Sequence, residues 1–200
     1  MKALVTGGGG FLGGAVARAL RARGDLVVSY ARGDYPELRR LGIETVQGDL
    51  ADEASLARAA RGCEAFFHVA AKPGLWGPIE EYRSANVDGT RNALAACRKA
   101  GVKKFIFTSS PSVVFGGKDL EGVDESTPYP AAYSAHYPAT KAEAERLVLA
   151  ANGPDLAVTA LRPHLIWGAG DNHLLPRLIA RRRSGALRRV GENKLVDTVY

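Results

Sequence analysis

Tyr137 and Lys141 lie four residues apart in the segment Tyr137-Pro138-Ala139-Thr140-Lys141. Residues at this spacing share one face of a helix, so an ammonium group would lie close to a phenol. A nearby positive charge favours the phenolate and lowers the tyrosine pKa, which suits the phenol to general acid or base catalysis near neutral pH. The same spacing also occurs by chance on exposed helices, so its meaning depends on the surrounding elements.

A cluster of serines precedes this pair, in the stretch Thr108-Ser-Ser-Pro-Ser112 at the end of a predicted strand. Ser110 could hold a substrate carbonyl beside Tyr137, and Ser109 and Ser112 are weaker candidates. The alternative is a polar loop without a chemical role.

Six of the nine residues from Thr6 to Gly14 are glycines, and they fit two phosphate-binding patterns. Gly8, Gly10 and Gly13 fit G-x-G-x-x-G, whereas Gly7, Gly10 and Gly13 fit G-x-x-G-x-x-G. A strand, a tight turn and a helix N-terminus direct backbone N–H groups at a pyrophosphate. Glycine turns also simply connect a strand to a helix. The candidate nucleotide contacts in this run are Gly7, Gly9, Gly10, Phe11, Leu12 and Gly13.

The tip of the second predicted strand distinguishes NAD from NADP. An acidic residue there would bind the ribose 2′-hydroxyl, but this chain has Ser29-Tyr30-Ala31-Arg32-Gly33. The guanidinium of Arg32 suits a 2′-phosphate, so we expect NADP rather than NAD, although Arg32 could be an ordinary surface arginine. Asp34 lies further into the loop.

Asp49 and Leu50 follow the third predicted strand. Asp49 could accept a hydrogen bond from an adenine amino group while Leu50 packs on the ring. The alternative is an acidic residue before a helix, a position that Asp52 already fills.

The net charge is +6, and much of the excess lies in one cluster. A solvated helix face followed by a loop is the simpler interpretation. Attraction of an anionic substrate or cofactor is the alternative. Nucleic-acid binding is the least supported interpretation, because no aromatic residues interleave the cluster. Its members are Arg177, Arg181, Arg182, Arg183, Arg188 and Arg189.

The remaining composition is that of an ordinary globular domain. Cys63 and Cys97 are expected to be buried thiols in a reducing cytoplasm. The four histidines do not share metal-binding spacing, so no metal is expected. No apolar stretch is long enough to span a bilayer, and because the first strand begins at Lys2 we expect no signal peptide.

The elements that must position these residues alternate between strands and helices. Parallel strands separated by helices predict a doubly wound α/β sheet that is covered on both faces, with ligands beyond the carboxyl ends of its strands. The predicted strands are Lys2–Thr6, Leu26–Tyr30, Ile43–Gln47, Ala65–His68, Lys104–Thr108 and Leu156–Leu161, and the predicted helices are Phe11–Arg23, Asp52–Arg61, Ile79–Ala100 and one from Pro138.

We expect a nucleotide-binding domain over residues 1–165 and the start of a substrate-binding segment over 166–200. In the latter, Gly168–Pro176 is predicted to be a loop, and Leu187–Val190 and Leu195–Tyr200 resemble short strands. Because Tyr200 falls inside an alternating apolar pattern, we expect this segment to be cut short.

Taken in order, the motifs resemble those of the extended short-chain dehydrogenase/reductase superfamily, over essentially the whole chain. They are TGGGGFLG, GDL, HVAA, NVDGT, FTSS, YPATK and LRP. The resemblance implies a Rossmann-type fold and the register of Gly7, Gly10 and Gly13.

The resemblance also implies a role for individual residues. Ser110 would orient a carbonyl, Tyr137 would pass a proton, and Lys141 would bind the nicotinamide ribose and tune Tyr137. Asn86 would support this catalytic set. The remaining expected cofactor contacts are Thr108 at the strand tip, Ala70 and Ala71 under the adenosine ribose, the adjacent Lys72, and Pro163 against the nicotinamide amide.

Longer segments are similar to the 3β-hydroxysteroid dehydrogenase-like branch, notably HVAAKPGLWG, TSSPSVVFGG and LRPHLIWGAGDNHLLPRLI. They resemble bacterial reductases of 2-alkyl-3-oxoalkanoates and sterol 4-carboxylate dehydrogenases. Both groups act beta to a carboxylate, for which Lys72 and the arginine cluster are candidate contacts. An exposed loop lysine is the alternative for Lys72.

Three functions remain open at this point. The first is an NADP-dependent oxidoreductase of a β-keto or β-hydroxy acid or a steroid-like substrate. The second is a nucleotide-sugar epimerase, which needs tightly held NAD and a diphosphate site. The third is a non-catalytic NADP-binding regulatory or scaffold protein, which the Tyr137–Lys141 pair disfavours. By analogy with the superfamily, a homodimer through helices such as Ile79–Ala100 is also expected.

Overall fold

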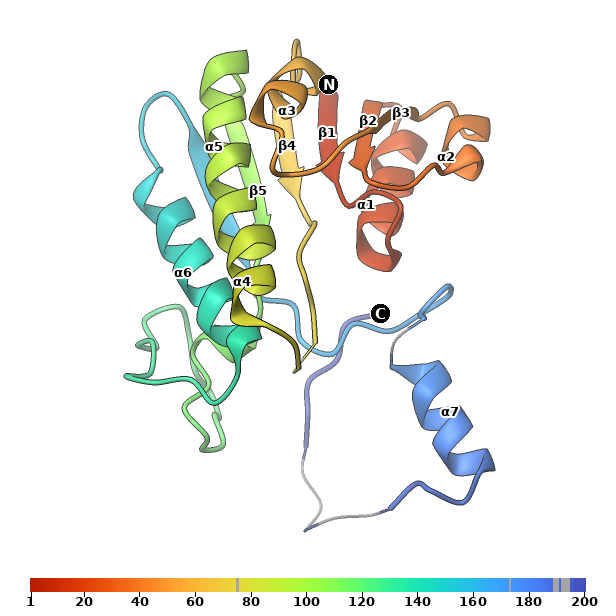
Figure 1. Cartoon of the computed structure of the whole chain (residues 1–200), viewed down its shortest axis with the longest axis vertical. Helices are drawn as coiled ribbons and strands as arrows, with labels where there is room; N and C mark the ends of the chain where they lie inside the picture. Colours follow the sequence, from red (N-terminus) through yellow and green to blue (C-terminus); the bar gives the residue numbers. More distant parts are fainter. Residues whose placement is uncertain (75, 173, 189–190, 192–194) are drawn as a thin grey trace. The chain divides into compact units, whose positions relative to one another are not determined.

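The computed structural model describes residues 1–74, 76–172, 174–188, 191 and 195–200. It divides into two compact units, Met1–Arg162 and Pro163–Tyr200. The first contains a six-stranded parallel sheet in the order β3-β2-β1-β4-β5-β6 (Figure 1). Its strands are β1 (Lys2–Thr6), β2 (Leu26–Ala31), β3 (Glu44–Gln47), β4 (Ala65–His68), β5 (Lys104–Thr108) and β6 (Ala157–Leu161).

This strand order confirms the expected doubly wound fold. The chain runs outward from β1 to β3, returns to β4 on the other side of β1, and continues outward to β6. The winding therefore reverses between β1 and β4, and ligands of such sheets bind beyond the carboxyl ends of the strands at this reversal.

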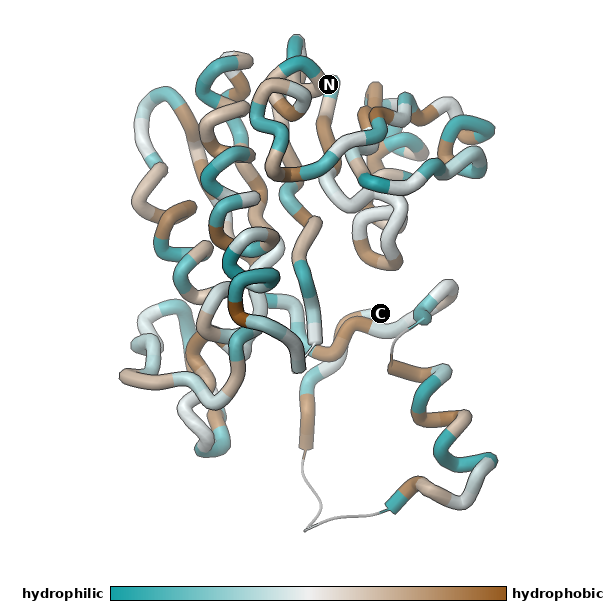
Figure 2. Tube along the Cα trace, viewed as in Figure 1, coloured by the Kyte–Doolittle hydropathy of each residue, from teal (hydrophilic) through white to brown (hydrophobic). Residues whose placement is uncertain are grey.

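Alternation along the strands builds a separate core on each face of the sheet. In β1, Leu4 packs with α3, α5 and α6, whereas Ala3 and Val5 pack with α1 and α2. Hydrophobic and hydrophilic residues likewise alternate along α5 and α6 (Figure 2). These helices are α1 (Phe11–Ala22), α2 (Pro36–Arg40), α3 (Glu53–Ala59), α5 (Gly89–Ala100) and α6 (His136–Ala150).

The cover of the sheet is less even than expected. Helices α3, α5 and α6 contribute to a continuous core on one face, while the core on the other face is built on α1 and α2 and lies mainly over β1, β2 and β4. Leu161 in β6 remains 52% exposed. Helices therefore cover both faces of the sheet, as predicted, and the cover is more extensive on the face of α3, α5 and α6.

The long helix predicted over Ile79–Ala100 is interrupted by a π-helix. The segment begins with α4 (Ile79–Tyr82), continues as the π-helix η1 (Arg83–Asp88), and ends with α5. Gly101 adopts a left-handed conformation, φ 71°, and ends the helix as expected. Insertions of this kind are frequent at functional sites, and apolar spacing does not distinguish them from a regular helix.

Other boundaries differ from the predictions by small amounts. The helix expected from Pro138 begins at His136, so the proline lies in its first turn, where its missing N–H costs nothing. The short helix α2 and the 3₁₀ turn η2 (Pro111–Val113) were not predicted. The predicted strands Ile43–Gln47 and Leu156–Leu161 each begin one residue later in the structure.

The second unit differs more from the sequence-based expectation. Helix α7 (Leu175–Arg183) begins inside the predicted loop Gly168–Pro176, because the Asp171 carboxylate accepts hydrogen bonds from the backbone nitrogens of Leu174 and Leu175. The predicted strand Leu195–Tyr200 is reduced to one bridge between Ile166 and Val199. Part of the predicted strand Leu187–Val190 lies outside the described residues.

The arginine cluster lies mostly on α7. Arg177, Arg181, Arg182 and Arg183 of the helix and Arg188 after it are all exposed, while Arg189 lies outside the described residues. No ion pair joins these five exposed arginines to an acidic residue in the described parts of the chain. Their exposure agrees with the simpler interpretation of a solvated helix face.

Candidate active site

The glycine run forms a compact turn between β1 and α1. Gly7 adopts a left-handed conformation, φ 69°, and its carbonyl oxygen accepts a hydrogen bond from Gly10 N at 2.9 Å. A Cβ on Gly13 would lie 2.1 Å from that same carbonyl oxygen. The three positions of the G-x-x-G-x-x-G pattern are thus linked to one another, because Gly7 makes the turn and Gly10 and Gly13 approach its carbonyl.

The start of α1 is suited to an anion. Gly10 occupies the N-cap position, no side chain in the described part of the chain caps the helix, and its first turn contains no acidic residue. The N–H groups of the first turn and the positive end of the helix dipole are thereby available to a phosphate.

Tyr35 completes the glycine turn, and sequence reasoning missed it. A Cβ on Gly9 would lie 2.0 Å from the Tyr35 ring, and a Cβ on Gly33 would lie 2.9 Å from the Tyr35 hydroxyl. The ring therefore packs directly on Gly9. The one sign of this contact in the sequence is the glycine at position 9, which leaves room for a ring to pack against the backbone.

The tip of β2 contains two charged groups that bear on the cofactor prediction, Arg32 and Asp34. Arg32 is exposed, and its backbone carbonyl accepts a hydrogen bond from the Gln47 side chain at 2.7 Å. Asp34 is bound by the Arg39 guanidinium through both carboxylate oxygens, and this ion pair lowers the Asp34 pKa. The carboxylate nearest Arg32 in the sequence is thus already engaged by a different cation.

The tip of β3 is fixed from two sides. The buried Tyr30 donates a hydrogen bond to the Asp49 carbonyl at 2.9 Å, and the Asn92 side chain donates one to the Leu50 carbonyl at 2.8 Å. Leu50 packs against Gly89. The Asp49 carboxylate is exposed and accepts a bond from Ala51 N at 2.9 Å.

A buried polar chain begins at His68, at the end of β4. Its Nε2 lies 3.1 Å from Thr90 Oγ1, and its Nδ1 lies 2.9 Å from Thr6 Oγ1. Thr90 donates its own proton to the Asn86 carbonyl at 2.6 Å, so it accepts from His68 Nε2–H. Nδ1 then accepts from Thr6. Burial, together with the charge of Lys141, lowers the pKa of His68 to about 3.

The same threonine holds the segment after β4. Thr6 Oγ1 accepts hydrogen bonds from the backbone nitrogens of Val69 and Ala70, at 3.1 and 3.2 Å. Ala70 also packs against Gly7, whose Cβ would approach it to 3.0 Å. The strand that enters the glycine turn therefore fixes the backbone of the predicted ribose-binding segment.

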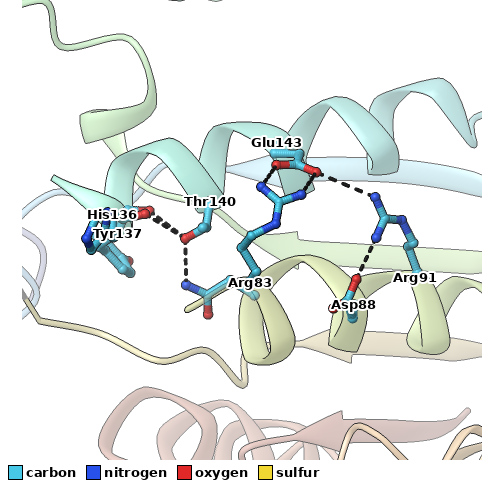
Figure 3. A network of polar contacts seen from close by, with 8 residues as sticks. Arg83, Asp88, Arg91, His136, Tyr137, Thr140 and Glu143 are labelled. Carbon is cyan, nitrogen blue, oxygen red and sulfur yellow. Dashed lines mark hydrogen bonds and ion pairs between the residues drawn. The ribbon is translucent and has the colours of Figure 1, made fainter. Parts of the chain in front are cut away.

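Asn86 connects this segment to the helix that contains Tyr137 and Lys141. Its Oδ1 accepts from Lys72 N at 2.7 Å, while its Nδ2 donates to the Lys72 carbonyl at 3.2 Å and to Thr140 Oγ1 at 3.1 Å. Thr140 donates in turn to the carbonyls of His136 or Tyr137 (Figure 3). Asn86 thus acts here through its side chain.

The outer side of this junction is held by charges. Glu143 on α6 accepts hydrogen bonds from both terminal nitrogens of Arg83 at 2.9 Å, and Arg91 lies between Glu143 and Asp88 (Figure 3). These residues are partly exposed, so such pairs contribute little to stability individually. They add a second link between α6 and the segment formed by η1 and α5.

Ser110 lies at the carboxyl end of β5 and caps η2. Its hydroxyl oxygen accepts a hydrogen bond from Ser112 N at 3.2 Å and lies 2.8 Å from Ser112 Oγ. Burial raises the pKa of Tyr137, while a hydrogen bond with Ser110 acts in the opposite direction. Ser110 thus lies near enough to influence Tyr137, whereas Ser109 is buried and Ser112 is bonded to Ser110.

Lys141 is almost completely buried in α6. Its Nζ donates a hydrogen bond to the Thr108 carbonyl at 2.6 Å and lies 4.0 Å from the centre of the Phe107 ring. Burial lowers the pKa of Lys141 to about 7, against the opposing effect of the Glu145 charge.

The expected lowering of the Tyr137 pKa is therefore not found, because burial dominates and moves it upward. The Lys72 ammonium forms an ion pair with Glu81 at 2.6 Å, and its expected contact with a substrate carboxylate stays a prediction. Pro163, the last expected cofactor contact, belongs to the second unit.

Comparison with known proteins agrees with this arrangement. Residues 4–200 match the 3-beta hydroxysteroid dehydrogenase/isomerase family. The chain belongs to this family. Its resemblance to the extended short-chain dehydrogenase/reductase superfamily is confirmed at the same time.

Two curated relatives of the family are 2-alkyl-3-oxoalkanoate reductases. The protein from Shewanella oneidensis is 48% identical over 99% of this chain and 53% of its own length. The protein from Stenotrophomonas maltophilia is 49% identical over 100% of this chain and 62% of its own length. The chain therefore spans little more than half the length of these relatives.

Solved structures share the fold. The structure titled MoeE5 in complex with UDP-glucose and NAD is 34% identical, with a TM-score of 0.79 over 90% of this chain and 60% of that one. DesIV, a dTDP-glucose 4,6-dehydratase from Streptomyces venezuelae with NAD and TYD bound, is 28% identical. Its TM-score is 0.81 over 92% of this chain and 63% of that one.

Proposed function

We propose that this chain contains the nucleotide-binding and catalytic part of an NADP-dependent oxidoreductase that interconverts a ketone and a secondary alcohol. The arrangement of Ser110, Tyr137 and Lys141 around the end of β5 is the observation that supports it. These residues lie at the same edge of the sheet as the glycine turn. The names of the curated relatives favour a β-keto or β-hydroxy acid as the substrate.

The residues present fit a dinucleotide. The uncapped start of α1 offers N–H groups to a pyrophosphate, and the close approach of Gly13 to Gly7 leaves no room for a Cβ in the cradle. We assign Asp49 and Leu50 to the adenine, and Ala70 and Ala71 to its ribose.

NADP is favoured over NAD by the charges at the tip of β2. Arg32 is exposed there, and the nearby Asp34 carboxylate is bound by Arg39 instead of being available for a ribose hydroxyl. A guanidinium forms strong charge-assisted hydrogen bonds with phosphate.

The bound nicotinamide would supply or accept the hydride. Ser110 would hold the substrate oxygen, and Tyr137 would donate a proton to that oxygen as the ketone becomes an alcohol. A phenol whose pKa is raised stays protonated at neutral pH, which is the form that the reductive direction needs. Lys141 would bind the nicotinamide ribose and add positive charge beside the developing alkoxide.

The test is a cofactor-coupled assay with NADPH and NADH against 2-alkyl-3-keto acids, steroids and nucleotide sugars. We expect Tyr137→Phe to reduce turnover at least ~100-fold and to leave NADPH binding intact. Tyr133→Phe is the matched control, because the Tyr133 hydroxyl donates to the Val113 carbonyl and takes no part in the chemistry. Full turnover by Tyr137→Phe would exclude this function, and turnover restricted to nucleotide sugars would favour an epimerase.

A further inference from the structure

Glu145 is completely buried in α6, one helical turn beyond Lys141. Arg162, at the end of β6, donates to its carboxylate from Nη2 at 2.5 Å and from Nε at 3.2 Å. Tyr129, from the loop before α6, donates its hydroxyl proton to the same carboxylate at 2.6 Å. A buried carboxylate with this many donors is a built feature of the fold, because an unpaired one would be very costly.

The groups around Glu145 also explain its ionisation. Burial alone would raise the pKa of Glu145, but the hydrogen bonds from Arg162 and Tyr129 keep it below its ordinary value. Arg162 and Arg146 both lie over the Tyr129 ring, at 5.8 and 4.2 Å from its centre. Glu145 therefore remains an anion in surroundings that otherwise contain cations.

Lys141 needs such an anion, because its own hydrogen-bond partner is neutral. Its Nζ contacts the Thr108 carbonyl and the Phe107 ring from β5, and neither group carries a charge. On β4, His68 is neutral at physiological pH. On α6, Tyr137 is a neutral phenol, and Glu145 is the carboxylate whose charge acts on Lys141.

We propose that Glu145 is a positioning residue whose buried charge, fixed by Arg162 and Tyr129 one helical turn from Lys141, favours the protonated form of the Lys141 side chain. The inference rests on the proposed function in one respect, since that function gives Lys141 its catalytic role. Without Glu145, the buried Lys141 would lose the carboxylate that lies one helical turn away on the same helix. Lys141 would then lose its proton at lower pH, because buried ammonium groups become neutral when they lack a counter-charge.

A purely structural role for Glu145 makes a different prediction. In that case the Glu145–Arg162 ion pair would join α6 to β6, and its removal would lower stability without changing the protonation of Lys141. Measuring the titration of Lys141 itself distinguishes the two roles, whereas measuring stability or turnover alone does not.

The experiment is an NMR titration of the chain labelled with ¹³C-lysine, in which the Lys141 Cε signal is assigned from its loss in Lys141→Met. We expect Glu145→Gln to lower the midpoint of Lys141 by about one pH unit. Glu145→Asp, which keeps the charge, should restore most of the wild-type midpoint. Glu143→Gln is the control, because Glu143 lies on the same helix but pairs with Arg83 and Arg91 at the surface.

A folded Glu145→Gln variant with an unchanged Lys141 midpoint would overturn the proposal. If that variant does not fold, ¹³C-glutamate labelling of the wild type decides the question. The proposal would be supported if Glu145 is ionised at pH 7 and Glu145→Asp keeps a Lys141 midpoint like that of the wild type. A Glu145 carboxyl that is protonated at pH 7 would overturn it. A different measurement tests the proposed function, since full turnover by Lys141→Met would exclude a catalytic role for Lys141 whatever its midpoint.

Discussion

The side-chain nitrogen of Asn86 lies 3.1 Å from the hydroxyl oxygen of Thr140, and this contact joins the π-helix to the helix that contains Tyr137 and Lys141. Both residues are buried. Because Asn86 also bonds both backbone polar groups of Lys72, it fixes the distance between the segment after β4 and the start of α6. We infer that the geometry of the catalytic set depends on this contact.

Replacing Thr140 with valine should therefore destabilise the chain although the two side chains have nearly the same shape. The variant removes the acceptor for Asn86 and leaves part of a buried amide without a partner. We expect the free energy of unfolding to fall by about 1–3 kcal/mol, measured by urea denaturation.

Thr159→Val is the matched control, because Thr159 lies in β6 and is exposed. An exposed substitution of this kind should change the free energy of unfolding by less than about 0.5 kcal/mol. Equal effects of the two substitutions would show that the Asn86–Thr140 contact contributes nothing specific.

Much of the fold and part of the site follow from local patterns. Short continuous apolar runs locate β1, β4 and β5, and the spacing of Tyr137 and Lys141 places both residues in one turn of a helix. The π-helix Arg83–Asp88 does not follow from such patterns.

Contacts between distant residues explain the other failures. Tyr35 packs on Gly9 only because a loop returns to the glycine turn, and nothing local in either segment indicates that return. The spacing of Lys141 predicts its helix face, but not that its flexible side chain ends at the Thr108 carbonyl. Glu145 similarly depends on Arg162, which lies seventeen residues further along the chain.

Gly13→Ala tests the glycine cradle. Alanine is favoured over glycine within a helix by about 1 kcal/mol, so a neutral site would be stabilised. Here the added Cβ would lie 2.1 Å from the Gly7 carbonyl oxygen, and backbone cannot rotate away as a side chain could. We expect a net loss of about 1–3 kcal/mol in thermal or urea unfolding, together with weaker NADPH binding.

Gly153→Ala provides the comparison, because a Cβ there meets nothing within 4 Å. It should leave both stability and NADPH binding close to the wild type. Unimpaired NADPH binding by Gly13→Ala would show that the turn tolerates a shift and that the cradle is not specific.

Arg32→Ala tests the preference for NADP. A charge-assisted hydrogen bond is worth about 1.5–3 kcal/mol, so the Kd for NADPH should rise about 10- to 100-fold. The Kd for NADH should not change, because NADH has no 2′-phosphate. Fluorescence titration with the two dinucleotides measures both values, and Arg40→Ala on the exposed side of α2 is the control. A parallel loss of NADPH and NADH affinity would contradict the assignment.

His68 makes a prediction about acid stability. Burial lowers the pKa of the folded histidine to about 3, whereas the unfolded chain has an ordinary histidine pKa of about 6.5. Above pH 6.5 both states are neutral, so His68 adds no pH dependence there. Between pH 6.5 and 3 the unfolded state binds a proton that the folded state does not, and stability should fall by up to about 1.4 kcal/mol per pH unit.

His68→Gln should be less stable than the wild type at pH 7.5, because the glutamine replaces a ring that bonds both Thr6 and Thr90. Its loss of stability between pH 7.5 and 5.5 should nevertheless be smaller, since the buried titrating group is gone. Urea denaturation at the two pH values measures this difference, and His136→Gln, at an exposed histidine, should keep the wild-type slope. Only a neutral His68 ring can accept from Thr6 while it donates to Thr90, so the folded state should resist protonation of this residue. If the loss of stability between pH 7.5 and 5.5 were as large in His68→Gln as in the wild type, the acid sensitivity would arise from other groups.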